Sequence, residues 1–413
     1  MVKSKVNNLR GLLTKTLGDD IEIIDQKTTL LTAPGEHYGS IMLALDVTIK
    51  QPTTGTKKYH LVAKLIPANE MLRVAFDIYV TFKKEVLAYT ETIPYITQLQ
   101  REYQVPPNHH FDKLFAKCYG ARVSLNPERN QVDEDAVLIF ENLKIQGYQT
   151  EDRLLGFGLK ASKVILRDLA RFHAAPIAVK RLKFDDFQSK ILPALVKNKG
   201  LEQLPPEVGV AFHNSIMEGA VEVPELGEYL PRVQKLVDYA AANPYVNRPP
   251  PNELWGSMSH SDFWTSNTMI LYDEQGEAVS NKIVDLQIMT YSSIARDVIF
   301  FMFTSIMNRV LEENYEELLR TYYDSFVNTL KEFRLDVSEY SWENFLKELE
   351  EVAPSEVYHV LVMLKPICTE RGKVEHSLEE FQDSDWSRKD LLGPSHRKKL
   401  KDTVLALVKR NWI

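Results

Sequence analysis

The stretch SHSDFWTSNTMILYDEQGEAVSNKIVDLQ, residues 259–287, decides the fold that we expect for this chain. It holds two short apolar segments, TMILY at 268–272 and KIVDL at 282–286, which are separated by the turn-rich DEQGEAVSN. Apolar segments on either side of such a turn predict a β-hairpin. We expect a register in which residue 268 faces residue 286.

Polar side chains gather at one end of this predicted hairpin. Asp262 and Asn267 precede the first strand, and Asp285 interrupts the second. The expected register brings Asp285 to within about one residue of Asn267 across the ladder. Carboxylate and amide oxygens, few in number, suit a Mg²⁺ ion that keeps its other positions for water and phosphate. Transfer of phosphate to a hydroxyl needs this set: an acidic group for the acceptor and two oxygens for the metal.

A structural interpretation of these residues is also open. Asp and Asn are common in turns, where their side chains bond to neighbouring backbone groups. Asp285 favours a functional site, because it interrupts the apolar run IVDLQI, where aspartate is disfavoured. A carboxylate in such a place needs a partner, and a cation is the natural one.

The rest of the chain divides into a β-rich part and a helical part. Residues 40–66 alternate between apolar and polar types as a hairpin would, and 71–94 show a helical period that ends near a proline. After Leu143 the pattern is mainly helical. We predict an α+β, bilobal fold. A small antiparallel sheet lobe with one main helix covers 1–141, and a larger, mainly helical lobe covers 142–413.

Composition excludes several classes of protein. The 413 residues are 44% hydrophobic and 26% charged, as in an ordinary globular protein. The net charge of −7 gives no general field that would attract nucleic acid. The most apolar run, at 298–307, has about half the length needed to cross a bilayer. The first residues lack the apolar core of a signal peptide, and there are only two cysteines, so we expect a cytoplasmic protein without a membrane span.

The first lobe offers a second indication of phosphate chemistry. Lys64 lies in the middle of the strand LVAKLI, where an unpaired ammonium is unexpected, and Glu85 lies in the helix that follows. A lysine and glutamate pair directed at phosphates is the arrangement that kinases use. A purely structural salt bridge explains the two residues almost as well.

The motifs, taken together and in order, resemble the ecdysteroid kinase-like family. That family is expanded in insects and belongs to the choline/aminoglycoside kinase branch of the protein-kinase-like superfamily. The resemblance implies that the α+β, bilobal fold is a protein-kinase-like fold. The resemblance is carried by HSDFWTSNTMI (260–270), KIVDLQIMTYSSIARDVIFF (282–301), IFENL (139–143) and LARFHA (169–174). It also includes the glycine turn in APGEHYGS (33–40), and it covers most of the chain.

The resemblance implies roles for individual residues. Asp262 would orient and deprotonate the acceptor hydroxyl, while Asn267 and Asp285 would hold Mg²⁺. Lys64 would contact the phosphates of ATP and would be positioned by Glu85. The remaining nucleotide contacts would come from the glycine turn and from the segment between the lobes, namely from Gly35, Tyr38, Gly39, Ser40, Glu141, Asn142 and Leu143.

Other residues are expected to have structural roles. Ser261 stands where the family usually has glycine; protein kinases carry arginine at this step, so we expect that the backbone does not demand glycine. Leu286 replaces a packing phenylalanine. His260 and Asp297 are expected to brace the catalytic loop, and His173 to be a core histidine.

These observations predict an ATP-dependent phosphotransferase that acts on the hydroxyl of a small molecule, with an ecdysteroid-like sterol favoured by the resemblance. A choline, ethanolamine or xenobiotic kinase remains open, as does a kinase-like binding module without activity. The sequence does not separate these acceptors, because the helices that would form the acceptor pocket cannot be placed. Four aromatic residues that would suit such a pocket are interpreted as core: Tyr291, Tyr322, Tyr323 and Trp342.

Overall fold

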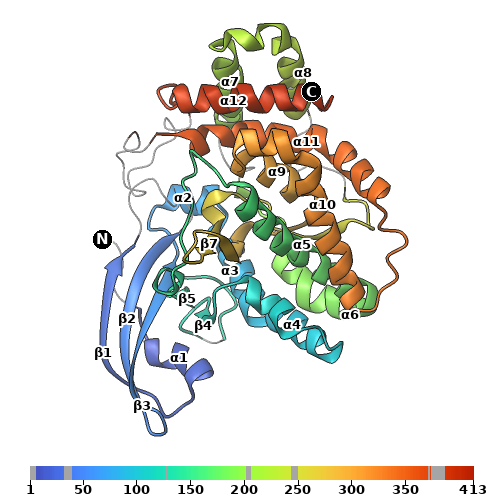
Figure 1. Ribbon diagram of the computed structural model, residues 1–413. Coiled ribbons are helices and arrows are strands. Elements are labelled where there is room, and N and C mark those ends of the chain that lie inside the picture. Colours follow the sequence, from blue (N-terminus) through green and yellow to red (C-terminus); the bar gives the residue numbers. More distant parts are fainter. Residues whose placement is uncertain are drawn as a thin grey trace.

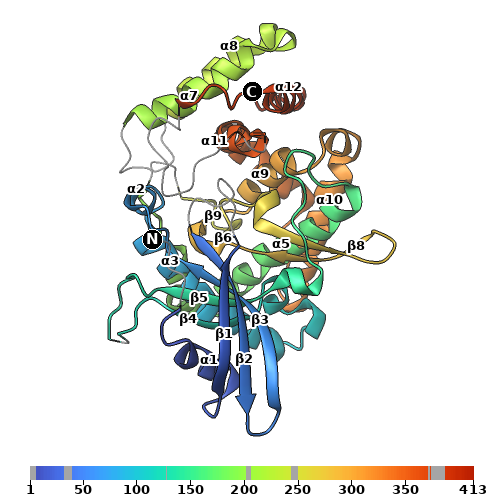
Figure 2. The same ribbon diagram turned by 90° about the vertical axis from the view of Figure 1, so that its left-hand side faces the viewer.

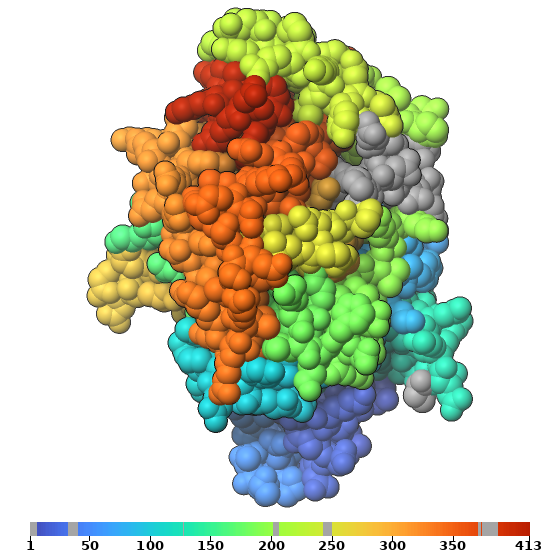
Figure 3. All heavy atoms as spheres, turned by 90° about the vertical axis from the view of Figure 1, so that its right-hand side faces the viewer, coloured from blue at the N-terminus to red at the C-terminus, as the bar shows by residue number. Residues whose placement is uncertain are grey.

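The computed structural model describes residues 6–31, 40–126, 128–200, 206–242, 250–370, 373 and 387–413. Within these residues an antiparallel sheet forms one end of the molecule and a larger mass of helices forms the rest (Figure 1). The space-filling view shows the sheet end as a narrow projection below the helical mass (Figure 3). The predicted bilobal α+β fold is therefore confirmed, whereas the boundary between residues 141 and 142 stays a prediction.

The sheet is built from strands in the order β1-β2-β3-β5-β4. Their bounds are Glu22–Leu30 for β1, Ile41–Gln51 for β2, Gly55–Leu65 for β3, Cys118–Arg122 for β4 and Val137–Glu141 for β5. The apolar residues of β2 alternate with polar ones, so that one face of the strand is buried, as at Leu45 and Val47. Helix α1 (Leu9–Leu17) packs on this face and closes a small core, to which Leu13 contributes.

The helix that follows the sheet hairpin differs from the prediction over 71–94. It is divided into α2 (Glu70–Ala75), α3 (Ile78–Leu87), a π-helical turn (Ala88–Thr92) and α4 (Ile93–Glu102). Pro94 does not end the helix, because it lies in the first turn of α4, where no intrahelical N–H bond is lost. The buried residues of α3 and α4 join the core of the helical lobe rather than the core under α1.

The helical lobe contains α5 (Leu159–Leu182), α6 (Phe184–Asp186), α7 (Pro206–Val221), α8 (Leu230–Ala242), α9 (Ala295–Ser305), α10 (Asn308–Glu332), α11 (Trp342–Cys368) and α12 (Pro394–Lys409). Helices α7, α8 and α12 lie at the end farthest from the sheet (Figure 2). Helix α5 continues through Pro176, because the residues on both sides of the proline are buried in the core. The apolar run at 298–307 forms most of α9, which is almost wholly buried.

Two short strand pairs position the loops between the lobes. β6 (Gly256–Ser259) pairs with β9 (Thr290–Ser293), and β7 (Thr268–Tyr272) pairs with β8 (Ala278–Ile283). The β7–β8 hairpin exists as predicted, but its register is different, because Thr268 faces Ile283 rather than residue 286. The turn is tighter than expected, with Gly276 at a φ of +76° and its N–H bonded to Asp273, so that β8 starts and ends earlier.

No helix in the part of the chain that the structure describes has both the length and the apolar character needed to span a membrane.

Candidate active site

Lys64 joins the two lobes through a buried ammonium. It lies on β3 opposite Leu138 of β5, and its side chain is only 4% exposed. Its Nζ donates to Oε2 of Glu85 at 2.6 Å and to Oδ1 of Asp285 at 2.7 Å. Burial opposes the charged form, but the charges of Asp285 and Glu85 outweigh it and raise the pKa of Lys64. The lysine therefore carries its positive charge at neutral pH.

Glu85 also fixes the segment that follows β8. Its Oε1 accepts a hydrogen bond from the backbone N–H of Leu286 at 3.2 Å. Asp285 itself has a φ of +65°, in the left-handed region, so the chain turns sharply there and does not continue as a strand. A single cluster thus contains Lys64 and Glu85, which were predicted for the nucleotide site, and Asp285, which was predicted for the metal.

Asn267 and Asp262 form a second pair at the same end of the hairpin. The side-chain Nδ2 of Asn267 donates to the backbone oxygen of Asp262 at 2.8 Å and to its Oδ2 at 2.9 Å. The N–H of Val284, next to Asp285, donates to the backbone oxygen of Asn267 at 3.1 Å. The predicted meeting of these residues therefore occurs even though the register differs, because Asn267 lies opposite Val284.

The surroundings of Asp262 increase the affinity of its carboxylate for a proton. Burial and the negative charge of Asp285 raise the pKa of Asp262 well above its ordinary range, against the hydrogen bonds from Asn267 and Trp264. Trp264 was not among the residues singled out from the sequence. Its position two residues after Asp262 in HSDFW was the signal that could have identified it.

A buried carboxylate braces the loop that carries Asp262. Asp297, at the start of α9, accepts hydrogen bonds from the N–H of His260 at 2.5 Å and of Ser261 at 2.9 Å. It also accepts from Oγ of Ser259 at 2.9 Å and lies 3.0 Å from Nε2 of His173. Burial alone would raise the pKa of Asp297, but the hydrogen bonds from His173 and from the N–H of His260 hold it below its usual value. The carboxylate is therefore ionised and fixes two successive backbone groups.

Ser261 corrects one expectation. Its φ is +67°, in the left-handed region, so the backbone at this step does favour glycine. A side chain there costs on the order of 1–2 kcal/mol. The bond of its N–H to Asp297 and the contact of its Oγ with Oγ1 of Thr290, at 2.8 Å, compensate for this strain.

Side chains satisfy part of the main chain in the segment between the lobes. The N–H of Glu141 donates to the oxygen of Lys117 at 2.9 Å, whereas the N–H of Lys117 is satisfied by Oε1 of the Glu141 side chain at 2.8 Å. The N–H of Lys117 therefore does not bond to the backbone oxygen of Glu141. Leu143 begins a short 3₁₀ helix (Leu143–Gln146), in which the first N–H has no intrahelical acceptor. Asn142 caps this helix through a bond from the N–H of Lys144 at 3.1 Å.

The predicted glycine turn is only partly described. Gly35, Tyr38 and Gly39 lie outside the described residues, and Ser40 is buried just before β2. The described residues contain no group of three or more His, Cys, Asp or Glu side chains that would hold a metal by themselves. The candidate metal ligands are instead one carboxylate and one amide, on Asp285 and Asn267.

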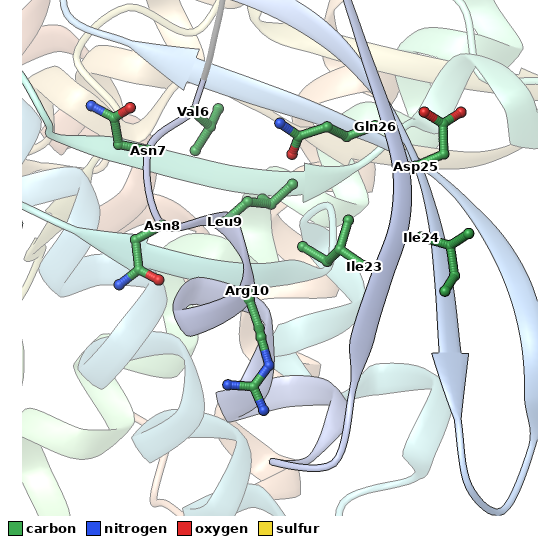
Figure 4. Close-up of a pocket in the computed structure, with 9 residues that line it drawn as sticks. All are labelled: Val6, Asn7, Asn8, Leu9, Arg10, Ile23, Ile24, Asp25 and Gln26. Atoms are coloured by element: carbon green, nitrogen blue, oxygen red, sulfur yellow. The ribbon is translucent and has the colours of Figure 1, made fainter.

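A groove of about 580 Å³ lies elsewhere, between the start of α1 and the edge strand β1 (Figure 4). It is lined by residues 6–10 and 23–26 and includes no residue of the predicted site. The figure shows side chains of the two segments on opposite sides of the groove, with Arg10 near its end (Figure 4). This groove therefore has no part in the site between the lobes.

The bilobal fold, with a strand lysine, a helix glutamate and a carboxylate after the hairpin, defines the class of protein-kinase-like proteins. The model of the ecdysteroid kinase-like family matches residues 34–335, which is most of the chain. The chain belongs to this family, as the motifs predicted.

Two solved structures are similar to the chain. One is an ethanolamine kinase from Plasmodium vivax, with 10% identity and a TM-score of 0.42 over 98% of this chain and 86% of that one. The other is a choline/ethanolamine kinase family protein from Mesorhizobium loti, with 12% identity and a TM-score of 0.33 over 87% of this chain and 90% of that one. The comparison with curated proteins found no match.

Proposed function

We propose that this protein is an ATP-dependent phosphotransferase that transfers the γ-phosphate to the hydroxyl of an ecdysteroid-like sterol. The observation that carries the proposal is the cluster at the end of the hairpin. There the ammonium of Lys64 bonds to Asp285 at 2.7 Å, and Val284 links that segment to the adjoining pair of Asn267 and Asp262. Membership of a kinase-like family supports phosphoryl transfer to a small molecule.

The residues at this cluster fit a magnesium ion. The Nδ2 group of Asn267 is engaged by Asp262, so its amide oxygen is the atom left for a cation. Asp285 offers a carboxylate, whose Oδ1 also accepts the hydrogen bond from Lys64. Two hard oxygen ligands suit an ion that completes its shell with water and nucleotide phosphate. When bound, Mg²⁺ would supply positive charge that stabilises the phosphates during transfer.

The nucleotide would lie between the sheet and the helical lobe. Lys64 would meet its phosphates, held in place by Glu85 from α3. The backbone oxygen of Glu141 and the N–H of Leu143 would meet the adenine edge, with Asn142 fixing the turn between them. The glycine turn, including Gly35, Tyr38, Gly39 and Ser40, would cover the phosphates.

Asp262 would act on the acceptor. As the acceptor oxygen forms its bond to the γ-phosphorus, the hydroxyl proton passes to the Asp262 carboxylate, and the bond from phosphorus to the ADP oxygen breaks. The raised pKa of Asp262 suits a group that must take up this proton. The hydrogen bonds from Asn267 hold one carboxylate oxygen in place, so that the other can meet the hydroxyl.

The proposal is tested by turnover of Mg²⁺-ATP with a panel of sterol, amino-alcohol and xenobiotic acceptors. Wild type is expected to phosphorylate a sterol, and Asp262→Asn to be slower by on the order of 10² or more, with ATP binding retained. Asp20→Asn, in the exposed turn after α1, is the matched control and should react at the wild-type rate.

The panel also separates the other functions. Turnover of choline or ethanolamine alone would show that the acceptor is an amino alcohol and not a sterol, and the assignment as a kinase would stand. A thermal shift with ATP but no transfer to any acceptor would identify a binding module. An Asp262→Asn variant as fast as wild type would remove Asp262 from its proposed role.

A further inference from the structure

Tyr322 reaches the catalytic loop through a buried histidine. The hydroxyl of Tyr322, on α10, lies 2.7 Å from Nδ1 of His173, on α5. The other ring nitrogen of His173, Nε2, lies 3.0 Å from Oδ2 of Asp297. Tyr322 and His173 are fully buried, and Asp297 is 1% exposed. Water therefore cannot replace either contact, and both ring nitrogens of the histidine depend on these two partners.

The direction of each hydrogen bond follows from its partners. The Asp297 carboxylate accepts from two backbone N–H groups and is ionised, so Nε2 of His173 must donate to it. Nδ1 is the other ring nitrogen, and the Tyr322 hydroxyl donates to it. Burial and the charge of Asp297 raise the pKa of Tyr322 well above its usual value, so that the hydroxyl keeps its proton.

The far end of this chain of contacts is the strained backbone at Ser261. Its left-handed φ of +67° is held by the bond from its N–H to Oδ1 of Asp297. Asp262 is the next residue, so a rotation of the Asp297 carboxylate would displace the carboxyl of Asp262. The histidine ring limits that rotation, because it is held on one side by Asp297 and on the other by Tyr322.

We propose that Tyr322 is a positioning residue: its hydroxyl fixes the tautomer and the ring orientation of His173, and through Asp297 it holds the loop that presents Asp262. The effect on turnover rests on the function proposed above. Tyr322 is a core residue, as the sequence indicated, but its hydroxyl gives it a role that an apolar core residue would lack.

The test uses Tyr322→Phe in the full chain, with Tyr323→Phe as the matched control. The hydroxyl of Tyr323, on the same helix, donates to the backbone oxygen of Tyr340 at 2.8 Å and is not part of the contacts to His173. Tyr322→Phe should lower kcat about tenfold with little change in the KM for ATP, since one buried acceptor loses its donor. Tyr323→Phe should keep the wild-type kcat. Equal losses of kcat in both variants would overturn the proposal.

Two measurements do not need turnover. Nitrogen-15 NMR of wild type should show His173 protonated at Nε2 only, and Tyr322→Phe should shift the signal of Nδ1 toward that of an unbonded nitrogen. Amide hydrogen exchange at His260 and Ser261 should become faster in Tyr322→Phe and not in Tyr323→Phe. A wild-type His173 protonated at Nδ1, or unchanged exchange, would overturn the proposal. Normal NMR and exchange results without turnover would count against the proposed function alone.

A double-mutant comparison tests the route through the backbone. Glycine adopts the left-handed conformation without support. In a Ser261→Gly background, Tyr322→Phe should therefore cost less in kcat, and hydrogen exchange at His260 should change less. The same tenfold loss in both backgrounds would show that Tyr322 does not act through the loop.

Discussion

Two buried lysines, Lys64 on β3 and Lys84 on α3, have opposite electrostatic situations. Lys64 is 3% exposed and Lys84 is 2% exposed. Lys64 bonds to Glu85 and Asp285, and its pKa is raised. The Nζ of Lys84, on α3, has no hydrogen-bond partner among the residues that the structure describes. Burial lowers the pKa of Lys84 to about 7, partly offset by the charge of Asp77.

Both lysines are buried, so hydrogen-bonding and charged partners, and not burial, decide whether such an ammonium keeps its charge. Removing an ammonium from water costs several kcal/mol unless anions and acceptors replace the water. Lys64 has two carboxylates within 3 Å, and these keep its ammonium charged. Lys84 has neither, although it is adjacent to Glu85 in sequence, because successive helix residues point about 100° apart.

The largest effect is expected when Lys64 is replaced by methionine. The variant keeps the volume but leaves Glu85 buried beside Asp285 without a counter-charge. We expect a loss of about 3–5 kcal/mol in the free energy of unfolding, and a fall in turnover of on the order of 10² or more. Urea unfolding and ATP-dependent turnover measure the two effects.

Lys58→Met is the matched control for this change. Lys58 lies on the same strand, is exposed, and makes only a surface ion pair with Asp46 at 3.4 Å. Its loss should cost at most about 1 kcal/mol. If Lys64→Met were as stable and as active as Lys58→Met, the bridge between the lobes would have no energetic importance.

Lys84→Met is expected to stabilise the protein. In the folded state the pKa of Lys84 is depressed, so between pH 7 and 10.5 the unfolded chain binds a proton that the folded chain does not. The free energy of unfolding of the wild type therefore rises with pH across this window. Below the window, the full cost of burying the charged ammonium remains. The variant has no ammonium to bury, so we expect its free energy of unfolding at pH 7 to exceed that of the wild type by about 2 kcal/mol or more.

The pH dependence provides the check on this second variant. Urea unfolding at pH 6, 7 and 10 should show the advantage of Lys84→Met at the two lower values and little of it at the highest. A variant that is less stable than wild type at pH 6 would mean that the ammonium is compensated in the folded protein, and the contrast with Lys64 would be lost.

The smallest expected effect concerns Ser261, where partners hold a strained backbone instead of a charge. Ser261→Ala loses the contact with Thr290 and keeps the strain, whereas Ser261→Gly loses both. Ser261→Gly should therefore be more stable than Ser261→Ala by about 1 kcal/mol. Thermal unfolding of the two variants gives this difference directly. Equal melting temperatures would contradict the left-handed conformation.

Local patterns predicted the elements better than their ends. The alternation in residues 40–66 gave the sheet hairpin, because one face of each strand is buried. The register of β7 and β8 was wrong by three residues, since the apolar run continues past Ile283. Nothing in that run shows that the chain turns at Asp285, where the bond from Leu286 to Glu85 sets the direction.

The family, the two lobes and the order of the polar motifs follow from the amino-acid sequence, because they depend on residue types and on periods that neighbouring positions reveal. The partner that each buried polar group meets across the molecule follows from the tertiary structure alone. Lys64 and Asp285 are 221 positions apart, and Tyr322 and His173 are 149 apart. Contacts over such separations arise from the packing of whole elements, so the charge on Lys64, the depressed pKa of Lys84 and the strain at Ser261 leave no local signal in the chain.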